Sequence, residues 1–156
     1  MQRTVWGTGV ALALSMLRPR PLRTSPVRWE LPASFAAVRT ARAYVRDYVD
    51  GLLDPQTGED AELITSELVA NAANASTEAS AVELGVQLIG NHLLIEVFDR
   101  AEGAPQRCCA SEFDEGGRGL LLVEELTRLW GWHPVPGGKV VWAVVPGDPD
   151  RSRSST

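Results

Sequence analysis

The sequence has little of several things, and each shortage excludes a class of protein. Only two of its 156 residues are cysteines, and they are adjacent, at Cys108 and Cys109. Neighbouring cysteines seldom close a structural bridge, so a disulfide framework is excluded and a reducing, cytoplasmic compartment is favoured. No apolar run reaches the roughly 20 residues of a transmembrane helix, so we expect no membrane span. The two histidines, His92 and His133, lack the spacing of a zinc site.

The chain also lacks a basic excess. It holds 15 basic and 20 acidic residues, for a net charge of −5, whereas a nucleic-acid-binding domain usually presents a basic face. Residues 29–150 contain 8 of the basic and all 20 acidic residues, so this body carries −12 between two basic ends. We therefore expect no nucleic-acid partner. An anionic ligand such as a nucleotide would need backbone amides, a helix N-terminus or a divalent metal.

What remains is the composition of an ordinary globular domain, with 44% hydrophobic and 22% charged residues. The length fits one domain, expected over residues 26–147, with 148–156 as a disordered tail. Residues 1–25 stand apart, since a mildly apolar stretch precedes Arg18-Pro19-Arg20-Pro21 without a clear cleavage site. We expect a disordered leader or a miscalled start, with Met16 as the alternative initiator, rather than a secretion signal.

Hydrophobic spacing predicts the element order β-α-α-β-β-loop-α-β-β. Residues 54–58 are expected to separate the first two helices, and residues 100–116 form a polar loop of a length that often signals function. This mixture predicts an α/β two-layer sandwich, with a mixed, mainly antiparallel sheet and helices on one face. The expected strands are Val27–Leu31, Ala81–Ile89, His92–Asp99, Gly131–Val135 and Lys139–Val145, and the expected helices run from Ser34 to about Leu53, Glu59 to Ser76 and Arg118 to Trp130.

Three segments carry residues suited to chemistry. Glu67 and Asn71 are four apart on the second helix and therefore share one face. Asp99 has the strand parity of Leu93, Ile95 and Val97, so its carboxylate points to the helix-covered side and must be paired there or accept from a ligand amine. Residues 115–119, Glu-Gly-Gly-Arg-Gly, lead into a helix whose free amides suit phosphate. Taken singly, each has an ordinary explanation: a solvated helix face, a solvated strand end and a helix cap.

Taken in order, these segments resemble the sequence boxes of the GHKL, or Bergerat-fold, ATP-binding superfamily. Glu67-Leu68-Val69-Ala70-Asn71-Ala72 is similar to its N box. Val97-Phe98-Asp99 with Gly103 is similar to the first glycine box, and Gly117-Arg118-Gly119-Leu120 to the second. The resemblance covers roughly residues 27–146 and is strongest to the small serine kinases that act as anti-sigma factors.

The resemblance implies a role for each matching residue. Glu67 would be the general base on an attacking serine hydroxyl, Asn71 the ligand of Mg²⁺ bridging the phosphates, and Asp99 the acceptor for the adenine amine. Residues 100–116 would form a lid over ATP. The implied ATP-binding set is Asn71, Asp99, Gly103, Gly117, Arg118, Gly119 and Leu120, with Asn71 also the metal ligand.

Departures from the family pattern leave alternatives open. The first glycine box has the single glycine Gly103, and Asn74-Ala75 stands where the family often has a basic or histidine pair. Arg118 either supplies a cation to phosphate or is a solvated first-turn arginine. Lys139 could reach phosphate, although an exposed strand lysine is the default expectation.

Three functions therefore stay in view. The first is an ATP-dependent kinase that phosphorylates a serine on a small antagonist protein and sequesters a sigma factor. The second is a non-catalytic ATP-binding partner-switch module, and the third a histidine-kinase-like catalytic fragment. The chain has no dimerisation helix pair bearing a phosphoacceptor histidine, which disfavours the third. The sequence names neither partner protein and leaves open whether the chain forms a homodimer.

Overall fold

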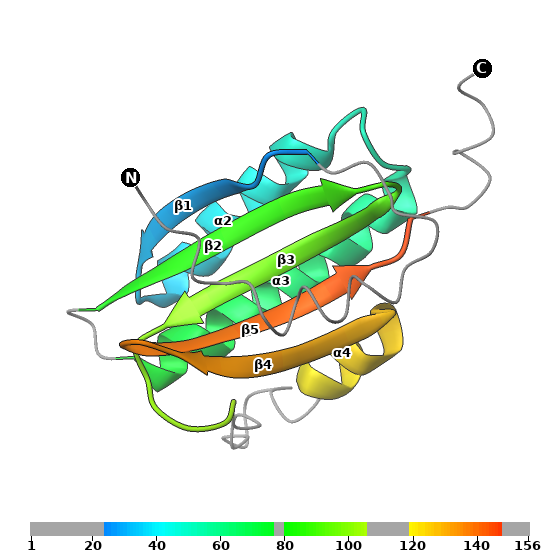
Figure 1. Ribbon diagram of the computed structural model, residues 1–156. Coiled ribbons are helices and arrows are strands. Elements are labelled where there is room, and N and C mark those ends of the chain that lie inside the picture. The colour runs from blue at the N-terminus through cyan, green and yellow to red at the C-terminus, as the bar shows by residue number, and fades with distance from the viewer. Residues whose placement is uncertain (1–23, 77–79, 106–118, 148–156) are drawn as a thin grey trace.

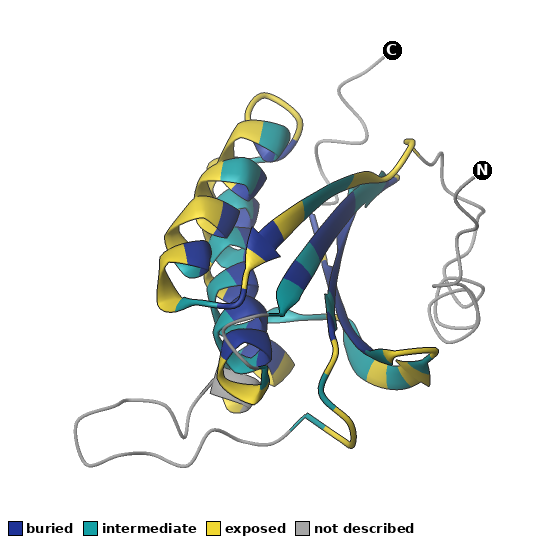
Figure 2. Ribbon diagram, turned by 90° about the vertical axis from the view of Figure 1, so that its left-hand side faces the viewer, coloured by how far each residue is buried: buried dark blue, intermediate teal, exposed yellow. Residues whose placement is uncertain are grey.

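The helices and strands form two layers, seen from two directions in Figure 1 and Figure 2. The computed structural model describes residues 24–76, 80–105 and 119–147. In Figure 2 the buried residues of the helices and of the sheet face each other. The predicted two-layer sandwich is therefore confirmed. Its elements are β1 (Val27–Pro32), α2 (Phe35–Val49), α3 (Pro55–Ala75), β2 (Ala81–Ile89), β3 (His92–Asp99), α4 (Gly119–Leu126), β4 (Leu129–Val135) and β5 (Gly138–Val145).

The five described strands form one sheet in the order β1-β2-β3-β5-β4, and every neighbouring pair is antiparallel. β3 is therefore flanked by β2 and β5. The register of β3 with β5 sets Asp99 directly opposite Lys139. This pairing joins the last residue of β3 to the second residue of β5, 40 positions further along the chain.

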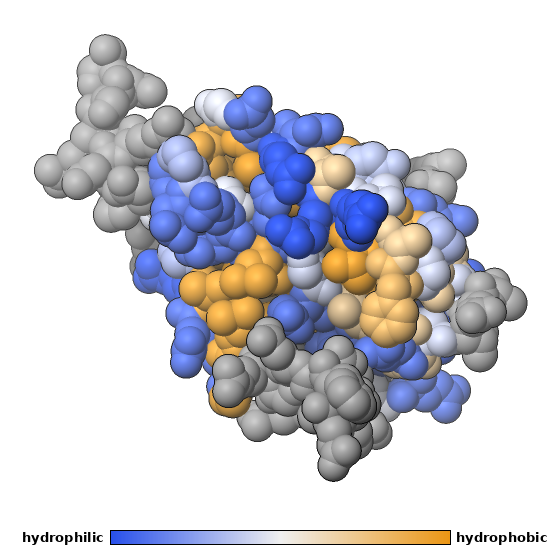
Figure 3. Space-filling view, turned by 180° about the vertical axis from the view of Figure 1, so that it is seen from behind, coloured by the Kyte–Doolittle hydropathy of each residue, from blue (hydrophilic) through white to orange (hydrophobic). Residues whose placement is uncertain are grey.

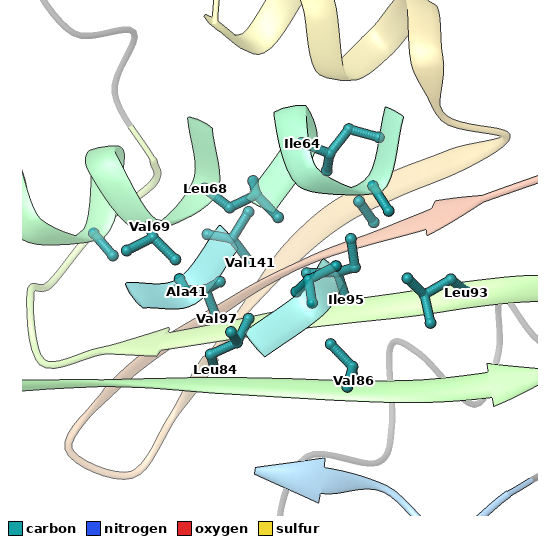
Figure 4. Packing of buried hydrophobic residues seen from close by; sticks show 14 of the residues in the cluster. Ala41, Ile64, Leu68, Val69, Leu84, Val86, Leu93, Ile95, Val97 and Val141 are labelled. Carbon is teal, nitrogen blue, oxygen red and sulfur yellow. The ribbon is translucent and has the colours of Figure 1, made fainter. Parts of the chain in front are cut away.

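The core lies between the sheet and the apolar stripes of α2 and α3. Figure 4 shows Leu68 and Val69 of α3 above Val97 and Val141, which belong to adjacent strands. Alternation along each strand produces this face, because Leu93, Ile95 and Val97 point the same way. The one fully buried hydroxyl of α3, on Thr65, donates to the Ala61 carbonyl, so it does not disrupt the apolar layer.

The helix α2 begins one residue after Ser34, which is its N-cap, and ends at Val49, before the expected Leu53. Phe35 is 70% exposed and Leu52 lies beyond the helix, half exposed. The buried stripe instead consists of Ala37, Ala41, Val45 and Val49. Small residues on this stripe let the helix lie close to the sheet, and the Trp29 ring of β1 stacks on Tyr44 at 4.9 Å between ring centroids.

The helix α3 begins earlier than expected. The run from Asp54 to Gly58 was predicted to interrupt the helical region, but Asp54 is the N-cap and Pro55 the first helical residue. The Asp54 carboxylate accepts from the Thr57 backbone amide at 2.9 Å. Proline suits this position because the first amides of a helix have no intrahelical acceptor. The acidic residues from Glu59 onward therefore lie beyond the first turn.

The helix α4 ends earlier than expected, and the prediction that it reaches Trp130 was wrong. Thr127 donates from its amide and its hydroxyl to the Val123 carbonyl at the helix end. Leu129 and Trp130 then pair with Val144 and Ala143 as the start of β4. Tertiary pairing overrides the local helical pattern here.

The outer face of the helix layer is largely polar. Figure 3 looks onto this face and shows hydrophilic side chains across its middle, with hydrophobic areas to either side. Glu62 of α3 accepts from Arg46 of α2 in two hydrogen bonds, at 2.9 and 2.8 Å, and thereby links the two helices. In the described part of the chain, no helix is long and apolar enough to span a membrane.

Candidate nucleotide site

Asp99 is a buried carboxylate at the end of the central strand β3. It is 1% exposed and continues the inward parity of Val97, as the sequence predicted. Its Oδ1 accepts two hydrogen bonds, from the Ala101 amide at 2.8 Å and from the Lys139 ammonium at 2.9 Å. None of the described residues donates to Oδ2. One side of the carboxylate is therefore fixed, and the other keeps its acceptor capacity.

The burial of Lys139 differs from the prediction. It was expected to be an exposed strand lysine, but it is 3% exposed and pairs with Asp99 inside the protein. Its Nζ also lies 3.5 Å from the Ala101 carbonyl oxygen. Strand parity could have revealed this, because Val141, Ala143 and Val145 alternate with it on the helix-covered face. Burying a charge is costly without a partner, so Lys139 and Asp99 depend on each other.

Glu67 and Asn71 lie one turn apart in the second half of α3, and both are partly buried. Neither forms an ion pair or a hydrogen bond with the described residues. Burial raises the pKa of the Glu67 carboxyl, and no cation among residues 24–76, 80–105 and 119–147 opposes this shift. A carboxyl of this kind takes up a proton more readily than a solvated one, which suits general base chemistry.

The direction of α3 brings these residues toward the same end of the sheet as Asp99. α3 and β3 run the same way in Figure 1, and α3 packs against both β3 and β5. Figure 4 places Val69 of α3 over Val97, and Asn71 and Asp99 each lie two residues further along their elements. The helix therefore carries an amide, and the strand a carboxylate, toward one end of the molecule.

Glycines shape the backbone around this end. Gly103, after β3, adopts a φ of +86°, which favours glycine, and a Cβ there would meet no atom within 4 Å. Gly138 needs its missing side chain for a different reason, because a Cβ would collide with the Asp99 backbone carbonyl. The start of β5 thus lies against the end of β3, and this close approach sets Lys139 beside Asp99.

The remaining predicted site residues are described only in part. Gly119 and Leu120 open α4, but their side-chain surroundings are not described, and Gly117 and Arg118 lie outside the described residues. The expected lid, 100–116, is described only as far as residue 105. The roles predicted for these residues stay predictions.

The donor set of the site fits an adenine nucleotide with a divalent metal. The described residues hold no cluster of three or more His, Cys, Asp or Glu that could bind a metal ion by itself. Mg²⁺ needs no such cluster, since it is commonly held by one or two protein oxygens together with phosphate oxygens and water. Asn71 of α3 offers one such amide oxygen, while the open side of Asp99 is left to accept from a ligand amine.

The comparison with protein families identifies the class of this fold. The sequence profile of the histidine kinase-like ATPase domain matches residues 31–145, well over half of the chain. The chain therefore belongs to the histidine kinase-like ATPase domain family. The predicted superfamily resemblance is thus confirmed.

One solved structure with a TM-score above 0.5 agrees with this fold. The crystal structure of the RsbU and RsbW domains of Rv1364c from Mycobacterium tuberculosis matches 80% of this chain, with 23% identity and a TM-score of 0.62. The histidine kinase domain of the blue-light activated histidine kinase from Erythrobacter litoralis EL346 matches 74% of this chain, with 19% identity and a TM-score of 0.46. The chain spans 33% of the first protein and 61% of the second. A comparison with curated proteins finds no match.

Proposed function

We propose that the chain binds ATP with Mg²⁺ and transfers the terminal phosphate to a serine of a small antagonist protein, as anti-sigma-factor kinases do. In this proposal the partners are that antagonist and a sigma factor. The family membership supports the nucleotide. The observation that carries the site is the buried Asp99 carboxylate, which has one oxygen held by Lys139 and Ala101 and the other available to an amine.

The residues divide the proposed work among them. Asp99 would accept from the adenine amine, Asn71 would supply an oxygen to Mg²⁺, and the backbone amides of Gly117 and Gly119 would bind phosphate. Phosphoryl transfer needs mainly positioning, charge neutralisation and one group that orients or deprotonates the nucleophile. Glu67 supplies that group, since burial raises the pKa of its carboxyl and it lies one turn from Asn71.

Calorimetry with ATP tests nucleotide binding directly. We expect a Kd between the low micromolar and the millimolar range, about −8 to −4 kcal/mol, as is typical of nucleotide sites. Chelating Mg²⁺ should weaken the affinity, because the uncharged Asn71 amide cannot neutralise the phosphates without the cation. An absence of heat and of any thermal shift at millimolar ATP would contradict the proposal.

The variant Glu67→Gln separates the kinase from a binding module. It keeps the size of the side chain and removes the base, so we expect unchanged ATP affinity and phosphate transfer slower by about 10²–10⁴-fold. Single-turnover transfer of labelled phosphate to the antagonist, at saturating ATP, measures this. Glu59→Gln on the exposed first half of α3 is the matched control. If Glu67→Gln transfers as fast as wild type, Glu67 is only a helix-surface carboxylate.

The non-catalytic partner-switch module is the other outcome of the same experiment. It is favoured by the single glycine of the first box and by the absence of a basic pair after Asn71. Wild-type protein that binds ATP but transfers no phosphate to any serine-bearing antagonist would establish it.

A further inference from the structure

The buried Lys139 has no role in the function proposed so far. It is the single lysine among the 15 basic residues of the chain, and it is almost fully enclosed, with its side chain 4% exposed. Stability alone does not account for such a residue. A buried ion pair can often be replaced by apolar residues of similar volume without loss of stability. The position of the ammonium against Asp99 therefore calls for a different explanation.

The position of Lys139 fixes the orientation of the Asp99 carboxylate. The ammonium and the Ala101 amide both donate to Oδ1, from β5 and from the segment after β3. Two donors from different segments fix the torsion of the carboxylate. They also occupy Oδ1, so that Oδ2 is the oxygen left to accept a further hydrogen bond. The ammonium also balances the carboxylate charge, so a neutral base can approach the buried pair.

We propose that Lys139 is a positioning residue for base recognition: it holds Oδ1 of Asp99 so that Oδ2 accepts from the 6-amino group of a purine nucleotide. This inference rests on the proposed function, which gives the adenine amine to Asp99, and adds Lys139 as the residue that decides which Asp99 oxygen is left for that amine. Lys139 acts through Asp99 and does not itself carry out chemistry.

A pair of nucleotides distinguishes positioning from a merely structural role. ATP carries the 6-amino group, and purine riboside triphosphate has hydrogen at that position but the same sugar and phosphates. If Lys139 only stabilised the fold, its loss would weaken both nucleotides alike. If it positions Asp99, its loss weakens ATP and leaves the 6-hydrogen analogue nearly unaffected.

The experiment is calorimetric titration of the full chain with each nucleotide in the presence of Mg²⁺. For Lys139→Met we expect ATP affinity to fall by about 10- to 100-fold, the usual range for a hydrogen bond to a charged group. Affinity for purine riboside triphosphate should stay close to that of wild type. Arg46→Met, which removes an ion pair on the outer helix face, is the control and should leave both affinities unchanged.

A second variant and a second readout protect the test from a folding defect. Lys139→Gln keeps an NH₂ donor group and loses the charge, so it should fold and lose part of the preference for ATP. Labelling with ¹⁵N-lysine gives one side-chain ammonium signal, since Lys139 is the single lysine. In wild type this signal should shift on adding ATP and shift much less with the 6-hydrogen analogue.

Other outcomes would overturn the inference. An equal loss of affinity for both nucleotides in Lys139→Met, or a full preference for ATP in both variants, would make Lys139 structural. Wild type that binds both nucleotides equally would show that the amine is not read, while leaving nucleotide binding intact. Wild type that binds neither would overturn the proposed function and this inference with it.

Discussion

The Glu96 carboxyl shows how burial of a single residue governs a property of the whole chain. It lies on the sheet face away from the helices and is 6% exposed. Burial raises its pKa to about 7, the Glu83 carboxylate adds to the shift, and the Arg28 guanidinium at 3.9 Å opposes it. An unfolded chain releases this proton near pH 4.5. Between these two values the folded state binds the extra proton, so stability falls as pH rises.

Glu96→Gln should remove this pH dependence. A pKa gap of this size corresponds to about 3 kcal/mol, so the variant should be more stable than wild type at pH 8 by up to about that amount. At pH 5, just above the unfolded value, the difference should be below about 1 kcal/mol. Urea unfolding at several pH values between 5 and 8 measures the difference, with Glu30→Gln on the exposed side of β1 as control. Parallel stability curves for Glu96→Gln and wild type would contradict the argument.

At the same scale, the sequence predicted Asp99 better than its partner. Strand parity alone gives the direction of Asp99, since alternation is a local property of the chain. Its pairing with Lys139 depends on the β3–β5 register, which joins residues 40 positions apart. Parity would also have turned Lys139 inward, but the general rule that lysines are exposed outweighed it. The rule that lysines are exposed fails for Lys139 because its ammonium is paired with Asp99 inside the protein.

Among the elements, α3 carries the predicted catalytic and metal-binding residues, and its stability begins at Asp54. The Asp54 carboxylate accepts from the Thr57 amide at 2.9 Å and also from the Thr57 hydroxyl. Asp54→Ala should lower the free energy of unfolding by about 1 kcal/mol, and by up to about 2, as for other lost N-caps. Chemical denaturation measures this loss.

ATP affinity of Asp54→Ala should stay at the wild-type value. Asp54 lies more than three turns of helix before Glu67 and Asn71, so the loss of the cap frays the far end of α3. Asp54→Asn, which keeps a capping oxygen, is the matched control and should lose little stability. A stable Asp54→Ala variant would show that packing of α2 on α3 fixes the helix start.

The sequence predicted which helices and strands form, but it predicted less accurately the residues at which they begin and end. The strands His92–Asp99 and Ala81–Ile89 were predicted to the residue, because alternation and the Gly90-Asn91 turn define both ends. The start of α3 and the end of α4 were not. Asp54 and Pro55 are typical of a turn and also of a helix start, so the sequence did not distinguish the two. Leu129 and Trp130 continue a helical pattern, but they belong to β4 because they pair with β5.

In the whole molecule, the candidate site is an assembly of segments that are distant in sequence. Glu67 and Asn71 come from a helix, Asp99 from the next strand but one, and Lys139 from the last strand. No single box in the sequence indicated this site. The order of the three boxes along the chain indicated it. The family resemblance supplied the arrangement, since no local rule predicts that β5 inserts between β3 and β4.

This assembly predicts that ligand binding stabilises the fold as one unit. A ligand that binds only the folded state adds about 2.7 kcal/mol at 100 times its Kd. For a chain of this length each kcal/mol raises Tm by about 2–4 °C, so ATP with Mg²⁺ should raise Tm by about 5–10 °C. Asn71→Ala removes the proposed metal ligand, so its Tm should respond to ATP equally with and without Mg²⁺.

Thermal unfolding with ATP alone, Mg²⁺ alone and both together measures this coupling. Gln56→Ala, on the exposed first turn of the same helix, is the matched control and should keep the wild-type response. The comparison is sharp because both variants shorten a side chain of α3, and only Asn71 lies at the end of the helix that approaches Asp99. A wild-type Tm that rises as far with ATP alone as with both would mean that the site holds the nucleotide without the metal, and Asn71 would then have no metal ion to coordinate.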